Sequence, residues 1–169
     1  MPFQIGEKVV YPNQGVGTIE NISSRSFGFG FEKFYLLRFG CNSMTVVVPL
    51  ANADNVGLRP ITKEREIARV LYFLSHGNCA AHSDWKVRCR ENAEKMQSGN
   101  LWLVAEVLKG LLLIYHDKPL SFRDKKTLER ARHMLVSEIS SVRHVTEAQA
   151  ADVLDRALAK ASLALPLPS

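Results

Sequence analysis

The sequence contains no apolar run long enough to cross a membrane and no segment that resembles a secretory signal. Its apolar stretches, such as Leu111 to Tyr115, span about one helical turn, whereas a membrane helix needs about 20 apolar residues. The N-terminus lacks a basic segment followed by an apolar stretch. We therefore expect a cytoplasmic protein.

Cysteine is also scarce. Cys41, Cys79 and Cys89 are an odd number and lie far apart, so a disulfide framework is not expected. Cys79 lies between His76 and His82, and all three residues are of types that bind metals. A structural zinc site usually takes four ligands in two close pairs, which this spacing does not provide. We expect neither a metal nor a cofactor.

Motifs for hydrolysis or phosphate binding are missing as well. The sequence has no G-x-S-x-G, no H-E-x-x-H and no cysteine–histidine pair in a recognisable setting. Gly15 and Gly17 flank Val16, but the residues after them resemble a strand, and a phosphate-binding loop requires a helix there. We interpret the glycines as a tight connection between strands and predict that the protein is not an enzyme.

The charge of the 169-residue chain is unevenly distributed. Residues 1–60 contain five basic and four acidic residues, whereas residues 61–169 contain seventeen and thirteen. Between Lys118 and Arg132 there are six basic and two acidic residues. This moderate basic excess permits contact with nucleic acid, but it is also typical of a solvated helix face.

The first 60 residues have the pattern of short strands. Pro49 ends the last long one, because proline cannot donate a hydrogen bond to a β-ladder. Several short strands in so short a segment predict a small barrel of the SH3 or Tudor type. The four strand-like segments are rich in β-branched and aromatic residues: Val9–Tyr11, Val16–Ile22, Phe34–Phe39 and Met44–Val48.

After residue 60, apolar residues recur with the period of an α-helix. Thr62 and Ser83 are suitable N-cap residues for the first two helices. Two later helices begin with capping-box sequences, "SFRD" at 121–124 and "TEAQ" at 146–149. The pattern predicts about five helices, with Trp102 packed in their core.

Together these patterns predict an α+β protein in two parts. A small Tudor- or SH3-like β-barrel would occupy residues 1–60. An all-α domain would follow over residues 61–165, with a short tail over residues 166–169. The boundary lies in "NVGLRPIT", where a glycine and a proline interrupt the strand pattern.

One stretch, "SDWKVRCRENAEKM" at 83–96, combines a tryptophan with basic residues at a predicted helix start. Lys86 and Arg90 are four residues apart and share a helix face, and Arg88 lies three residues from Trp85. Such a tryptophan can stack on an unpaired base or wedge into a base step while the basic residues hold phosphates. The alternative is a tryptophan packed between helices, with its basic neighbours in water.

Four stretches, in this order, carry a resemblance to a known family: "GEKVVYPNQGVGTIENI", "MTVVVPLANADNVGLRPI", "DWKVRCRENAEKMQSGNLWLVAEVLKGL" and "LSFRDKKTLERARHMLVSEIS". Together they resemble the CarD/CdnL family of bacterial RNA polymerase-binding transcription regulators. The resemblance extends from about residue 3 to about residue 160.

The resemblance implies that a Tudor-like N-terminal module binds the β subunit of RNA polymerase, partly by strand addition. It also implies that the helical domain contacts promoter DNA at the upstream edge of the transcription bubble. There a tryptophan wedges into the minor groove and stabilises the open complex, typically at ribosomal RNA promoters. We expect a monomer without membrane contact, associated with the nucleoid through the polymerase.

Carried over residue by residue, the resemblance assigns the wedge to Trp85. The basic residues that it implies in DNA contact are Lys86, Arg88, Arg90 and Lys125. The residues that it implies in polymerase contact are Arg25, in a loop between strands, and Thr45, Val46, Val47, Val48 and Pro49.

Four positions depart from the family pattern. Val87 and Val47 replace residues that are basic in other members, Cys89 replaces an aromatic residue, and Gln14 replaces a common histidine. These departures imply weaker DNA affinity and a polymerase contact that depends more on backbone pairing than on charge. The alternative function is a polymerase-binding adaptor without direct DNA contact.

Overall fold

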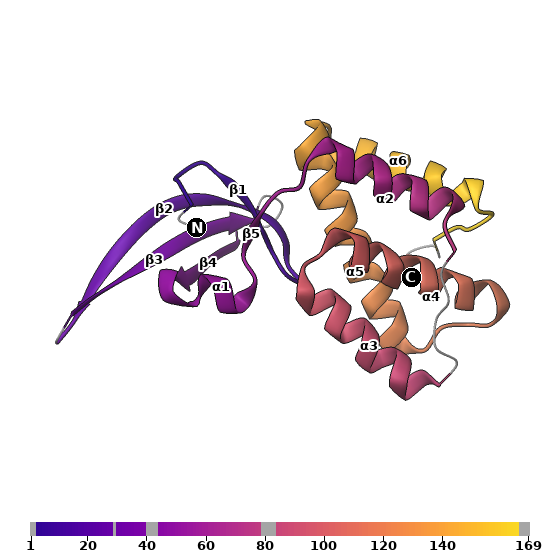
Figure 1. Ribbon diagram of the computed structural model, residues 1–169, viewed down its shortest axis with the longest axis horizontal. Coiled ribbons are helices and arrows are strands. Elements are labelled where there is room, and N and C mark those ends of the chain that lie inside the picture. Colours follow the sequence, from indigo (N-terminus) through magenta and orange to yellow (C-terminus); the bar gives the residue numbers. More distant parts are fainter. Residues whose placement is uncertain (1–2, 29, 40–43, 79–83, 166–169) are drawn as a thin grey trace.

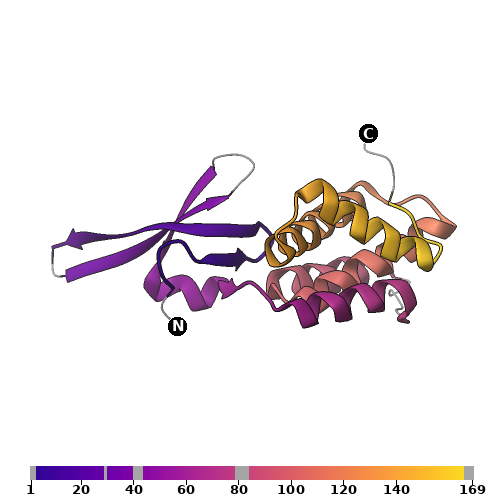
Figure 2. The same cartoon turned by 90° about the horizontal axis from the view of Figure 1, so that it is seen from above.

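The computed structural model describes residues 3–28, 30–39, 44–78 and 84–165. The chain forms two parts, a β-sheet from its N-terminal third and a bundle of helices from the rest (Figure 1). Seen from above, the sheet lies at one end of an elongated molecule and the bundle at the other (Figure 2). The α+β fold class predicted from the sequence is confirmed.

In the part of the chain that the structure describes, the sheet has five antiparallel strands in the order β4-β3-β2-β1-β5. Every second residue of a strand points to one face, and these positions form an apolar core that includes Val9, Ile19, Leu37 and Val48. The sheet therefore has a core of its own. Its strands are β1 Lys8–Tyr11, β2 Gly15–Phe27, β3 Gly30–Phe39, β4 Met44–Pro49 and β5 Arg59–Pro60.

The hairpin of β2 and β3 is longer than the sequence predicts. Residues 23–30 have the composition of a loop, but strand pairing continues to Phe27 and Gly30. Ladder hydrogen bonds join backbone groups, so polar residues can extend a hairpin without an apolar pattern. Arg25 therefore lies within β2, exposed and opposite Glu32, and not in a loop.

Three short elements between β4 and the bundle were not predicted, and the first is the 3-10 helix η1, Leu50–Asn52. The helix α1, Ala53–Val56, ends at Gly57, whose φ of 81° is in the left-handed region that favours glycine. The strand β5, Arg59–Pro60, pairs with β1. Elements of two to four residues are too short to produce a recognisable period in the sequence.

Within the described residues the bundle contains five helices, which agrees with the sequence prediction. The predicted cap residues Ser121 and Thr146 accept hydrogen bonds from the backbone N–H groups of Asp124 and Gln149. The helices are α2 Glu64–His76, α3 Trp85–Ser98, α4 Leu101–Asp117, α5 Phe122–Arg143 and α6 Glu147–Lys160.

The other two predicted caps need correction. The N-cap of α2 is Lys63, whose extended backbone, with φ of −93° and ψ of 158°, places the helix start at Glu64. Thr62 lies one residue earlier, and its backbone N–H donates to Glu138 Oε2 at 2.8 Å. Ser83 lies outside the described residues, and α3 is capped by Asp84, whose carboxylate accepts from a backbone N–H in the first turn.

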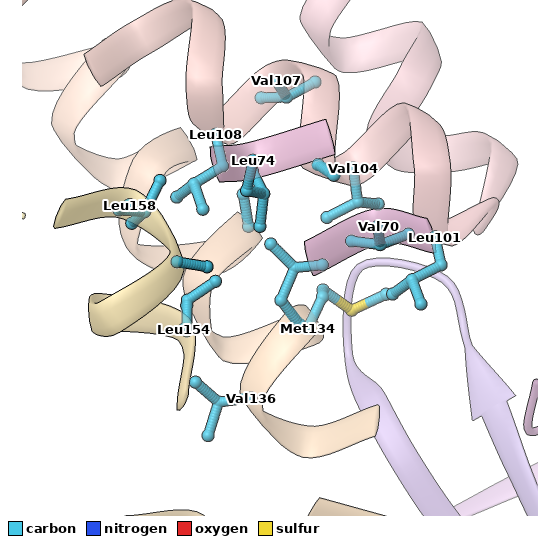
Figure 3. Packing of buried hydrophobic residues seen from close by; sticks show 14 of the residues in the cluster. Val70, Leu74, Leu101, Val104, Val107, Leu108, Met134, Val136, Leu154 and Leu158 are labelled. Atoms are coloured by element: carbon cyan, nitrogen blue, oxygen red, sulfur yellow. The ribbon is translucent and has the colours of Figure 1, made fainter. Parts of the chain in front are cut away.

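Apolar residues from α2, α3, α4, α5 and α6 meet in the core of the bundle, and part of this core is shown in Figure 3. Full burial of one such side chain stabilises a fold by about 1.5–3 kcal/mol, so this cluster dominates the stability of the bundle. Trp102 packs against it with its ring centroid 4.7 Å from that of Phe73, which confirms its predicted place. The cluster includes Val70, Leu74, Val104, Leu108, Met134, Leu154 and Leu158.

The turn between β1 and β2 docks the sheet on α5. Gly15 has a φ of +109°, and a Cβ atom on it would lie 3.0 Å from His133 Nε2. Only glycine allows this approach without strain. The ring of His133 lies 3.1 Å from the carbonyl oxygen of Gln14, and Ser137 Oγ accepts from the N–H of Val16 at 3.0 Å. The glycines thus form a tight connection, as predicted, and bring it against the bundle.

An ion pair strengthens this joint. Arg59 of β5 donates two hydrogen bonds, at 2.7 and 2.8 Å, to the carboxylate of Glu138, which is 1% exposed. The Nε of Arg59 also donates to the carbonyl oxygen of Gly99 at the end of α3. Because Val10 of the sheet belongs to the core of the bundle, the division into independent domains at residue 60 stays a prediction.

Candidate functional site

Trp85 is the first residue of α3, and its side chain is 56% exposed. Asp84 holds the start of the helix by accepting from the N–H of Lys86 at 3.0 Å. The helix packs on its neighbours through Arg88 and Met96, which are both buried. Trp85 is consequently left at the surface, which favours a contact with a partner over packing between helices.

Trp85 borders a groove of about 870 Å³ between α3 and the first turns of α5, two helices that contact each other in the bundle (Figure 1). Lys86 and Arg90 line the same groove from α3, as their spacing predicts. The Nζ atom of Lys86 lies 5.8 Å from the centroid of the Trp85 ring, within cation–π range. Three of the residues assigned to DNA contact therefore share one open surface.

Arg88 does not join them. Its Nη2 atom lies 3.0 Å from Oδ2 of Asp124 on α5, and both side chains are almost completely buried. A buried guanidinium cannot reach a phosphate in solvent, so its position argues against the predicted DNA contact. Cys89 lies beside the pair, with Sγ 3.8 Å from the other carboxylate oxygen of Asp124. Arg88 instead links α3 to α5.

Residues of α5 that the sequence analysis did not single out also line the groove, among them Phe122, Arg123, Lys126 and Arg130. Phe122 is 74% exposed, and Lys126 Nζ lies 4.7 Å from the centroid of its ring. The three basic residues have the spacing i, i+3, i+7 of one helix face, and this signal could have revealed them. Lys125, the assigned basic residue of α5, is exposed but does not line the groove.

The groove carries an excess of positive charge. Five basic residues line it, and we call them the groove cations: Lys86, Arg90, Arg123, Lys126 and Arg130. Within the described part of the chain, none of the five lies in ion-pair range of a carboxylate. The acidic residue in the lining, Asp124, is already paired with Arg88. The groove is therefore suited to an anionic partner.

The strand β4 forms one edge of the sheet, with β3 on one side and no neighbouring strand on the other among the described residues. Such an edge presents backbone N–H and C=O groups to a partner strand. Thr45 and Val47 are exposed, Val46 and Pro49 are half-buried, and Val48 is buried. The residues of β4 that are assigned to polymerase contact thus lie on a strand that can accept another, whereas Arg25 lies on β2.

The described residues contain no group of three or more histidine, cysteine or carboxylate side chains that could hold a metal ion. Cys41, Cys79 and His82 lie outside the described ranges. The His76 ring lies 2.7 Å from Ser75 Oγ and stacks on a tyrosine. In the same part of the chain, no helix combines the length and the apolar character needed to span a membrane.

Comparison with known proteins connects both parts of the chain to one family. The family model described as "CarD-like/TRCF RID domain" matches residues 3–62, and that described as "CarD, C-terminal domain" matches residues 69–155. The chain is 31% identical over 147 residues to "Putative transcription factor YdeB" of Bacillus subtilis (strain 168). The aligned residues cover 87% of this chain and 96% of that protein. The chain therefore belongs to the CarD-like family of transcription factors.

Proposed function

We propose that this protein binds RNA polymerase through its N-terminal sheet and stabilises the promoter open complex through its helical bundle. Membership of the CarD-like family supports an interaction with the polymerase and a role in transcription. One observation carries the DNA contact. Trp85 is exposed at the start of a helix, beside two basic residues that line the same groove.

On the polymerase side, the β subunit supplies a strand that pairs with the open edge of β4. Backbone hydrogen bonds then provide most of the affinity, and the exposed side chains of Thr45 and Val47 provide specificity for the partner strand. Arg25, exposed on β2, makes an additional polar contact. This mode suits an edge strand whose side chains are mainly apolar.

On the DNA side, Trp85 contacts an unstacked base step at the upstream edge of the bubble. Stacking of one base on an aromatic side chain is worth about 1–3 kcal/mol. A stabilisation of about 1.4 kcal/mol would slow bubble collapse about tenfold. Lys86 and Arg90 hold DNA phosphates near Trp85, and Lys125 contacts the part of the DNA backbone that passes outside the groove. Arg88 stays in its buried pair and positions α3.

Attachment to the polymerase makes a weak DNA contact sufficient. Once one of two linked sites is bound, the other site experiences a high effective concentration of its own partner, provided that both sites can be engaged at once. The firm joint between sheet and bundle favours this geometry. Sequence readout should be slight, because the minor groove carries little sequence information.

The test is the replacement Trp85→Ala in an open-complex lifetime assay on a ribosomal RNA-type promoter. We expect polymerase binding to be unchanged and the lifetime to fall about tenfold, since one stacking contact is lost. Tyr72→Ala, which removes another exposed aromatic side chain from a helix, should leave the lifetime unchanged. A lifetime unaffected by Trp85→Ala would refute the wedge and favour an adaptor without DNA contact.

A further inference from the structure

Two exposed aromatic residues line the groove between α3 and α5, one from each helix. Trp85 is the first residue of α3, and Phe122 is the first residue of α5. They are 56% and 74% exposed, and each has a lysine within 6 Å of its ring centroid, Lys86 and Lys126 respectively. Because both rings are exposed, packing within the fold does not account for them. Their repeated pairing with a cation indicates a partner with flat apolar surfaces and negative charge.

The arrangement of the groove cations gives the form of this partner. Arg123, Lys126 and Arg130 follow one another along one face of α5, and the first and last are about 10 Å apart along the helix axis. Both helices also begin at this groove, so the positive ends of their dipoles add to the charge. A row of cations beside aromatic rings matches a chain of phosphates that alternates with bases.

We infer that the groove holds an unpaired DNA strand, with bases stacked on Trp85 and Phe122 and phosphates held by the groove cations. This inference rests on the proposed function and extends it from one wedge to a site for at least two nucleotides. The volume of about 870 Å³ lies within the range of about 300–1,000 Å³ for small-molecule sites, so more than one base can enter. In a duplex the bases stack on one another and their faces are covered, so a duplex can contact only the groove cations.

A second hollow of about 450 Å³ lies beside the groove, between α5 and the sheet, and it shares Asn13, Lys126 and Arg130 with the groove. Its lining also includes Glu129 and Glu147, whose carboxylates disfavour phosphates. The proposed site for the unpaired strand is therefore limited to the groove that Trp85 and Phe122 line.

The experiment measures binding of the full-length protein to a fluorescent single-stranded 12-nucleotide DNA and to a blunt duplex of the same sequence. Fluorescence anisotropy at low and at physiological salt gives both affinities. We expect the single strand to bind more tightly than the duplex. Phe122→Ala should weaken single-strand binding at least about fivefold and change duplex binding less than about twofold, because only the single strand stacks.

A separate variant tests the contribution of the groove cations to DNA binding. Lys126→Glu should weaken binding of both DNAs and reduce the salt dependence, since it removes a phosphate contact and adds a repulsion. Two controls are matched in chemistry and lie outside the groove lining: Tyr72→Ala for the aromatic change and Lys160→Glu for the charge change. Both should bind like the unchanged protein. Circular dichroism and thermal unfolding of every variant establish that it is folded.

The outcomes separate this inference from the proposed function. Equal affinity for single strand and duplex, or single-strand binding that is unaffected by Phe122→Ala, would overturn the groove assignment even if Trp85 controls open-complex lifetime. Single-strand binding that depends on Phe122, with a lifetime that does not depend on Trp85, would support the groove and refute the proposed function. Binding of a polyglutamate peptide in place of the single strand would also overturn the assignment.

Discussion

At the scale of single residues, neighbouring basic side chains of α3 have opposite environments. Lys86 and Arg90 face the groove, whereas Arg88 between them turns inward to Asp124. Successive residues of an α-helix are about 100° apart, so residues two positions apart lie on different faces. The family resemblance treats these residues as one basic run, but the structure assigns Arg88 to holding α3 against α5.

Asp124→Ala tests this assignment. The change removes the buried carboxylate that contacts Arg88, so we expect the free energy of unfolding to fall by about 3–5 kcal/mol. Urea unfolding followed by circular dichroism measures it. Asp152→Ala, which breaks an exposed pair with Arg156 on α6, should cost less than about 1 kcal/mol. Equal costs for the two variants would contradict a structural role for the buried pair.

At the scale of elements, the sheet has two different edges. One edge is β5, which is two residues long and leads directly into the bundle. The other edge is β4, which is six residues long and has Val47 exposed at its middle. Proteins usually protect long exposed edges, because unpaired backbone groups invite another strand. Among the described residues no strand pairs with the outer side of β4, which suits a docking strand.

Val47→Asp tests the use of this edge. In the proposed complex the new carboxylate would be desolvated against the added strand, so affinity for RNA polymerase should fall at least about tenfold, or about 1.4 kcal/mol. Biolayer interferometry with purified polymerase measures it. Ile5→Asp, at a residue before β1 that is similarly exposed, should have no effect. Wild-type affinity of Val47→Asp would exclude pairing along β4.

At the scale of the whole molecule, the joint between sheet and bundle sets where Trp85 and the groove cations lie relative to the polymerase in the proposed complex. Glu138 accepts two hydrogen bonds from Arg59 and one from the backbone of Thr62, so one buried carboxylate ties β5 and the start of the bundle to α5. A flexible linker would let the bundle reorient. This joint instead gives it one orientation.

Glu138→Ala tests the importance of that orientation. Loss of the buried partner of Arg59 should lower the free energy of unfolding by about 2–4 kcal/mol. Below the unfolding temperature, polymerase binding should persist while open-complex lifetime shortens, because Trp85 is no longer held beside the fork. Glu64→Ala, which breaks an exposed pair with Arg143, is the control. An unchanged lifetime would show that a rigid joint is not required.

The sequence was sufficient where local pattern controls structure. Alternating and helical periods identified four strands and five helices, and "TEAQ" marked the capping box of α6. Errors arose where a distant partner decided the outcome. Thr62 has the side chain of an N-cap, but α2 begins one residue later and the backbone N–H of Thr62 instead bonds Glu138, 76 residues away. Serine and arginine in β2 have no strand pattern, yet pairing with β3 extends the strand through them.

By itself the sequence determined the fold class, the family and the position of Trp85 at the start of a basic helix, because each of these depends on residues close together in the chain. Only the tertiary structure decided that Arg88 is buried with Asp124, that Phe122 and Lys126 share a groove with Trp85, and that Gly15 docks the sheet on α5. The physical reason is that periodicity shows which face of an element is apolar, whereas long-range packing decides which faces meet.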